Sequence, residues 1–242
     1  HRAVGAPNIR NAGGGAIVQT GTADLALTVA DATGRAGRID NSGGTIASNA
    51  NTWINAASLA NQGGVLSAAG GAALQLNVLG ELKNSQGLIS SETALRIDSG
   101  ALDNDAGLIQ SGGNLAIDTH GQQLTNQNAA QFAGAGADAG QGGIRSAGSL
   151  TLATGLLKNQ GGFIGSNGAL QASTQGVDNT AGGVLQGASS VQVQAGSGTY
   201  DNRRGQTLAG DDLTLSANRI DNDAGLIQSV GQVALQARGI SN

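Results

Sequence analysis

The 242-residue chain lacks several residue types on which ordinary globular domains depend. It has no cysteine and no methionine, and it has only one proline, one tryptophan, one tyrosine and two phenylalanines. The lack of cysteine excludes disulfides and thiolate metal sites, and it is compatible with an exported protein. The scarcity of bulky side chains excludes a thick core built around them.

Charge is also scarce, because only 12% of the residues are charged and the net charge is −4. No basic stripe is available to displace counterions, so nucleic acid is not an expected partner. No apolar run approaches the roughly 18 residues of a membrane span. The segment from His1 to Val4 does not read as the start of a signal peptide. We therefore expect a soluble segment, internal to a longer chain.

Glycine, in contrast, is abundant at 42 residues, and the chain is repetitive. An aliphatic or aromatic residue, any residue and then asparagine recur ten times. A fixed period of about 20 residues is the signature of a repeat architecture and argues against disorder. The recurring asparagines are Asn41, Asn61, Asn84, Asn104, Asn126, Asn159, Asn179, Asn202, Asn222 and Asn242.

Within each repeat the apolar residues follow a period of two, which is typical of strands. Leu115-Ala116-Ile117 places two aliphatic side chains on one face, and Gly107-Leu108-Ile109 adds an inward isoleucine after a glycine turn. Short strands joined by glycine and asparagine corners predict an all-β fold, a parallel β-helix. We expect about 20 residues per coil and roughly ten to eleven coils. The coils stack at about 4.8 Å, so their inward residues form continuous ladders.

The regular period breaks in two places. Extra residues at 30–38 and at 127–141 predict two loops that leave an otherwise continuous solenoid. We therefore expect residues 1–242 to form a single β-helix segment, with no boundary between domains. The sequence stops at Ile240-Ser241-Asn242, at the start of a coil and without a polar cap, which favours continuation in the natural molecule.

The repeat unit, read from Leu102 to Ser111 as aliphatic-x-Asn-x-x-Gly-x-Ile-x-Ser, closely resembles the haemagglutinin repeats of large bacterial exoproteins. These exoproteins are exported by two-partner secretion, and they include filamentous haemagglutinin adhesins and contact-dependent growth inhibition exoproteins. The resemblance covers nearly the whole chain, and it implies a right-handed β-helix shaft. The Asn-Pro-Asn and Val-Glu-Asn-Asn motifs of such proteins are absent, so secretion signalling and toxicity are expected outside these residues.

The recurring asparagine is the strongest local signal. Asparagine tolerates the left-handed conformation and bonds its own backbone at tight corners, and stacked amides form ladders between layers. We interpret Asn41 to Asn222 as a structural corner ladder, with a ligand array as the alternative. Aspartate directly precedes the recurring asparagine in three successive coils, at Asp178, Asp201 and Asp221. If these aspartates stack, the carboxylate row would attract a divalent cation or a basic partner. The competing interpretation is a solvated corner relieved by Arg203 and Arg204.

Catalytic chemistry has few candidates. Asp211 and Asp212 are neighbours at a turn, and the carboxylates beside Asn104 and Asn222 recur with the repeat itself. His120 is the only histidine besides His1, and no hydrolase triad order, metal-spaced histidine pair or phosphate loop is present. We predict no catalytic, cofactor or metal residues, and no cofactor.

Surface binding has two further candidates. Counting the alternation from Ile46 places the indole of Trp53 outward, where it can stack on a sugar or a partner, although a local slip would bury it. Phe132 lies in the second predicted loop, and loops on a rigid frame often carry recognition.

The functional hypothesis is a structural shaft of a secreted, cell-surface adhesin or toxin-presenting exoprotein that mediates contact with other cells. The resemblance implies an outer-membrane transporter, engaged by other parts of the parent, and a protein or glycan on the target cell as partners. The rod itself is expected to be monomeric, without a transmembrane segment. The alternative is that this segment itself binds carbohydrate or a receptor, and a more distant one is a β-helix enzyme that degrades polysaccharide.

Overall fold

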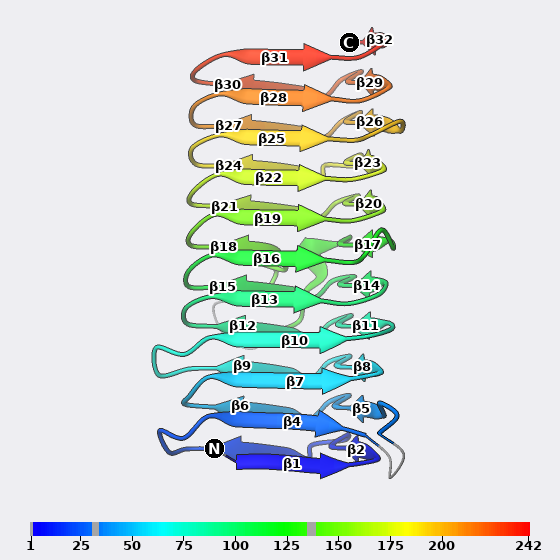
Figure 1. The fold of residues 1–242 in the computed structure, drawn as a ribbon. Helices are drawn as coiled ribbons and strands as arrows, with labels where there is room; N and C mark the ends of the chain where they lie inside the picture. The colour runs from blue at the N-terminus through cyan, green and yellow to red at the C-terminus, as the bar shows by residue number, and fades with distance from the viewer. Residues whose placement is uncertain (1, 31–33, 135–138) are drawn as a thin grey trace.

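A computed structural model describes residues 2–30, 34–134 and 139–242 of the chain. The chain winds into a solenoid in which each coil contributes one strand to each of three parallel sheets, here called A, B and C, except that the last described coil contributes only to A and B (Figure 1). The path from A to B to C rises as a right-handed turn (Figure 1), the hand expected for parallel crossovers. The prediction of a right-handed parallel β-helix of ten to eleven coils is confirmed.

Sheet A contains β1 (Arg2–Ala6), β4 (Leu25–Val29), β7 (Thr52–Ala56), β10 (Leu74–Val78), β13 (Leu95–Asp98), β16 (Leu115–Asp118), β19 (Leu150–Ala153), β22 (Leu170–Ser173), β25 (Val191–Gln194), β28 (Leu213–Ser216) and β31 (Val233–Gln236). Sheet B contains β2 (Asn8–Arg10), β5 (Arg38–Asp40), β8 (Ser58–Ala60), β11 (Leu82–Lys83), β14 (Leu102–Asp103), β17 (Leu124–Thr125), β20 (Leu156–Lys158), β23 (Gly176–Asp178), β26 (Thr199–Asp201), β29 (Arg219–Asp221) and β32 (Gly239–Ser241). Sheet C contains β3 (Ala16–Gln19), β6 (Thr45–Ser48), β9 (Val65–Ala68), β12 (Leu88–Ser91), β15 (Leu108–Ser111), β18 (Gly143–Ser146), β21 (Phe163–Ser166), β24 (Val184–Gly187), β27 (Gln206–Ala209) and β30 (Leu226–Ser229).

The core is a set of aliphatic ladders parallel to the long axis. Leu95 pairs in register with Leu115, and Ile109 pairs with Ile144, so equivalent residues of successive coils stack. Both Ile109 and Leu115 are buried, while Gln110 and Ala116 are only half-buried on the outer faces. This alternation is what the period of two predicts. Each coil needs neighbours above and below to bury these ladders, so stability comes from stacking.

Both sequence irregularities lie between strands of the solenoid. In the first, Ala30 and Ala36 form an isolated antiparallel bridge, and Arg38 already belongs to β5; residues 31–33 lie outside the described part. In the second, a 3₁₀ turn, η1, spans Ala129–Gln131, and residues 135–138 lie outside the described part. Gly142 returns to the coil, where its N–H donates to the carbonyl of Ala129.

Candidate functional site

The recurring asparagines form one continuous hydrogen-bonded ladder inside the corner between sheets B and C. The Nδ2 atom of each donates to the Oδ1 atom of its counterpart in the next coil, as from Asn84 to Asn104 and from Asn104 to Asn126, each at 2.7 Å. The same Nδ2 also donates to its own corner, as from Asn104 to the Gly107 carbonyl at 3.3 Å. These side chains are 0% exposed from Asn41 to Asn202. The amides are therefore sealed from solvent and are not open to an external ligand. The other ladder bonds join Asn11 to Asn41, Asn41 to Asn61, Asn61 to Asn84, Asn126 to Asn159, Asn159 to Asn179, Asn179 to Asn202, Asn202 to Asn222 and Asn222 to Asn242.

The sequence pattern predicts the left-handed backbone conformation of the corner at the asparagine. The structure shows that the asparagine does not adopt it. The left-handed residue lies two positions later, where Gln86 has φ 58° and Ala106 has φ 47°. The chain changes direction at the two residues that follow the asparagine. The asparagine can therefore keep its amide in the ladder. The glycine that follows is required for a different reason: a Cβ on Gly107 would overlap the main-chain carbonyl of Asn84 and the Oδ1 of Asn104. The motif Asn-x-x-Gly thus pairs an inward amide with a residue small enough to pass it.

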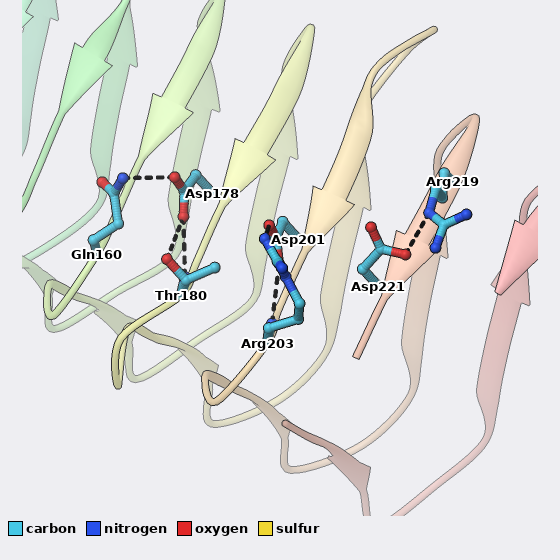
Figure 2. A network of polar contacts seen from close by, with 7 residues as sticks. All are labelled: Gln160, Asp178, Thr180, Asp201, Arg203, Arg219 and Asp221. Atoms are coloured by element: carbon cyan, nitrogen blue, oxygen red, sulfur yellow. Dashed lines mark hydrogen bonds and ion pairs between the residues drawn. The ribbon is translucent and has the colours of Figure 1, made fainter. Parts of the chain in front are cut away.

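The three aspartates of the predicted row do stack, because Asp178 pairs in register with Asp201 and Asp201 with Asp221. Figure 2 shows that each carboxylate is engaged by a neighbouring side chain. Arg203 donates to both oxygens of Asp201 at 2.9 and 2.6 Å, and Arg219 donates to Asp221 at 2.5 Å (Figure 2).

Asp178 accepts from the Thr180 hydroxyl at 2.7 Å and from the Gln160 amide at 2.5 Å (Figure 2). Hydrogen bonds from Arg203 lower the pKa of Asp201 below its ordinary value. Each carboxylate of the row thus accepts hydrogen bonds from a neighbouring side chain, an arginine at Asp201 and Asp221 and neutral side chains at Asp178.

These corner and ladder features repeat along the chain, and the comparison with protein families matches that repetition. The family model described as haemagglutinin repeat matches residues 3–86, 145–199 and 188–242, which is well over half of the chain. The chain belongs to the haemagglutinin repeat family. The resemblance seen in the sequence is therefore confirmed. A search of curated proteins and a search of solved structures returned no significant match.

Residues 87–144 of this haemagglutinin-repeat chain lie outside the family matches and contain the second loop. The coils there nevertheless stay in register, since β15 pairs with β18 across the inserted residues. The inserted residues therefore do not interrupt the stack.

Trp53 lies on the outer face of sheet A, between Ala26 and Gln75 of the adjacent coils. Thr52 and Ile54 on either side are buried, so the indole faces outward and is half-buried. It borders a shallow hollow of about 260 Å³ that Gln75 and Arg96 also line. This is the face given by the alternation counted from Ile46, and the structure does not show the alternative in which a local slip buries the ring.

Phe132 differs from the sequence expectation of a ring on the surface. It is only 4% exposed, because the loop folds back over sheet C, where the Phe132 side chain packs beside Gly142. Leu108, under this loop, is buried, while its register partner Leu88 is half-buried. Phe132 therefore anchors the loop. Only part of the Phe132 side chain is exposed, and that part borders a groove that Leu88 also lines.

One cluster in the haemagglutinin-repeat solenoid was not predicted from the sequence. Asp98 and Asp118 are register partners on sheet A, and His120 places its ring nitrogens 3.9 and 3.8 Å from their carboxylate oxygens. Ligand atoms of the three residues all lie within 4.8 Å of one another. Arg96, however, donates to both oxygens of Asp98 at 2.6 and 3.0 Å. The guanidinium therefore already engages Asp98, and the cluster is a surface ion pair between Arg96 and Asp98 with Asp118 and His120 beside it.

Two of the carboxylates considered as catalytic candidates form hydrogen bonds between neighbouring coils. Asp212 accepts from the main-chain N–H of Gln232 at 2.8 Å, and Asp103 accepts from the Ser85 hydroxyl at 2.7 Å. Both bonds join one coil to another.

The part of the chain that the structure describes contains no helix with the length and apolarity that crossing a bilayer requires.

Proposed function

We propose that this chain is a section of the structural shaft of a secreted, cell-surface filamentous adhesin or toxin-presenting exoprotein. The observation that supports this most directly is the uninterrupted stack: three sheets and one asparagine ladder continue through every coil. Eleven strands of sheet A spaced at about 4.8 Å extend the rod by about 48 Å. The shaft separates the part of the parent that contacts a target cell from the cell that displays it.

The haemagglutinin repeat family is a structural, adhesin-type family whose members are typically secreted or displayed at the surface. In this proposal the parent chain passes through an outer-membrane transporter of the two-partner type, which engages residues other than these. The partner at the far end is a protein or glycan of the target cell. The shaft itself acts as a monomeric rod, because its sheets already pair within one chain.

The test is to change the length of the rod by deleting one whole coil. Deleting residues 82–101 removes β11, β12 and β13 and joins the chain at Leu102, the register partner of Leu82. This variant should fold, and its rod should be shorter by about 4.8 Å in small-angle scattering or electron microscopy. On bacteria that display the parent protein, it should still reach the surface.

The matched control removes half a coil. Deleting residues 82–91 removes β11 and β12 and so places two sheet A strands in succession. This variant should aggregate or lose cooperative unfolding, because inward residues no longer meet their ladders. Equal tolerance of the two deletions would contradict the coil as the unit of the shaft.

A further inference from the structure

A groove runs along the outer face of sheet C, from β9 to β24, parallel to the axis of the rod. It has a volume of about 670 Å³ and crosses six successive strands of the sheet. At about 4.8 Å per strand its length is about 24 Å. We call it the C groove. A cleft of this length suits a linear polymer better than a compact ligand.

The floor of the C groove consists mainly of polar side chains, and Gly165 contributes no side chain to it. It is built from the third residue of each strand, where the side chain points outward, and the register pairs Ser67 with Ser90 and Ser90 with Gln110. The row continues through Arg145, Gly165 and Gln186. In the next coil the same position is Leu208, which lies outside the groove lining. The groove therefore coincides with the stretch of coils whose outward row carries hydroxyl, amide or guanidinium groups, or no side chain at all.

One wall is aromatic. The guanidinium carbon of Arg145 lies 4.1 Å from the centre of the Phe163 ring, which is a cation–π contact. A Cβ on Gly165 would meet the edge of this ring at 2.6 Å, so the ring leans over Gly165 and the absence of a side chain there makes room for it. Arg145 is held in place by hydrogen bonds to the Gln141 and Gly142 carbonyls at 3.0 and 3.3 Å. The wall is therefore positioned by its neighbours without any ligand.

The opposite edge is the corner between sheets C and A, which carries small residues such as Ala69, Gly112 and Ala147. Of the described residues that line the groove, two are ionisable, and their charges are opposite: Glu92 and Arg145. Glu92 already accepts from the main-chain N–H of Gly71 at 2.7 Å. The lining thus has no net charge, which disfavours a polyanion or a polycation.

We infer that the C groove binds a linear, uncharged oligosaccharide lying along the rod. The hydroxyls of Ser67 and Ser90 and the amides of Gln110 and Gln186 match sugar hydroxyls. The half-buried ring of Phe163 offers the part that Arg145 does not cover as an apolar surface to sugar C–H groups. A peptide would gain less, because the groove lies on a sheet face whose main-chain groups are already paired. This role goes beyond the shaft function and does not depend on it.

The experiment begins with the unmodified chain on an array of neutral and anionic oligosaccharides of increasing length. The best neutral oligosaccharide is then titrated by calorimetry against variants. Ser90→Trp fills the floor of the groove, and Phe163→Ala removes the wall. Ala116→Trp is the matched control, because Ala116 also lies outward but on sheet A. Thermal unfolding establishes that each variant is folded.

We expect binding of a neutral oligosaccharide with a Kd at or below about 1 mM. Ser90→Trp and Phe163→Ala should weaken it at least tenfold, while Ala116→Trp should change it less than twofold. The inference is overturned if no neutral oligosaccharide binds, if the control weakens binding as much as Ser90→Trp does, or if anionic oligosaccharides bind preferentially and are released by salt. None of these outcomes alters the rod length measured for the coil deletions, so the shaft proposal is judged separately.

Discussion

The hydroxyl of Tyr200 lies 2.6 Å from the hydroxyl of Thr207 in the interior of a single coil. Tyr200 stands in the sheet B ladder between Val177 and Ile220, and Thr207 stands in the sheet C ladder, where Ile227 follows it. The larger ring in one ladder meets the smaller side chain in the other. Thr207 also donates to the Oδ1 of Asn202 at 3.2 Å, which connects this pair to the asparagine ladder.

This arrangement predicts unequal effects from removing either hydroxyl. Tyr200→Phe leaves Thr207 bonded to Asn202, so the free energy of unfolding should fall by only about 0.5 to 1 kcal/mol. Thr207→Val leaves the Tyr200 hydroxyl buried without a partner, so it should cost more, about 1 to 3 kcal/mol. The double variant should cost less than the sum, and urea unfolding of all four proteins measures the difference. Additive costs would show that the two hydroxyls do not interact.

Tyr200 also predicts a loss of stability in alkali. Burial raises the pKa of Tyr200 well above its ordinary value of 10.0, so the folded protein keeps a proton that the unfolded chain releases above pH 10. Stability from this residue is therefore constant below pH 10 and falls as the pH rises further. Between pH 10 and 11 the native protein should lose about 1 kcal/mol more than Tyr200→Phe does. Parallel curves for the two proteins in urea at these pH values would refute the assignment.

The asparagine ladder predicts a large penalty for one missing amide. Asn104→Ala leaves Asn84 without its acceptor and Asn126 without its donor, both in a buried corner. The free energy of unfolding should fall by about 2 to 4 kcal/mol. Asn77→Ala is the control, since Asn77 makes a similar bond to Asn55 at 2.8 Å but on the outer face.

Water can replace the lost bond at that outer position, so the control should cost less than about 1 kcal/mol. Urea midpoints compare the two variants. Similar midpoints would mean that burial of the ladder contributes nothing.

Metal removal should have little effect on this protein. Arg96 holds Asp98, and Asp178, Asp201 and Asp221 are each bonded to a neighbouring side chain, so these carboxylates are already satisfied. We expect the Tm to change by less than about 2 °C in EDTA, which corresponds to at most about 1 kcal/mol for a chain of this size. An increase in Tm on adding Zn²⁺ that disappears in His120→Ala would instead identify a metal site.

The fold could be predicted because its determinants are periodic. Equivalents of Ile109 and Asn104 recur at the coil period, so the stacking of these positions follows from their spacing alone. The ion pairs between Arg96 and Asp98 and between Arg219 and Asp221 were not predicted, although residues two apart on a strand share a face and the pairs could have been inferred from that rule.

Other features depend on contacts that spacing does not contain. The left-handed residue two positions after each asparagine depends on how the amide is held inside the coil, which the motif letters do not reveal. Phe132 lies in a non-repeating loop, so no period indicated that its ring would turn inward. The Tyr200 and Thr207 pair required knowing which residues of sheets B and C face each other across the core.

The asparagine ladder also has a direction. From Asn41 to Asn222 each amide donates toward the following coil and accepts from the preceding one, and the orientation is enforced because each Nδ2 also faces main-chain carbonyls such as that of Gly107. One amide cannot turn over without breaking the bonds on both sides, so the amides are locked into a single sense along the rod. Coils can therefore be exchanged or duplicated only head to tail. A coil presented in the opposite sense would bring two donors or two acceptors together in a corner that water does not reach, and the ladder thus enforces one polarity along the described coils.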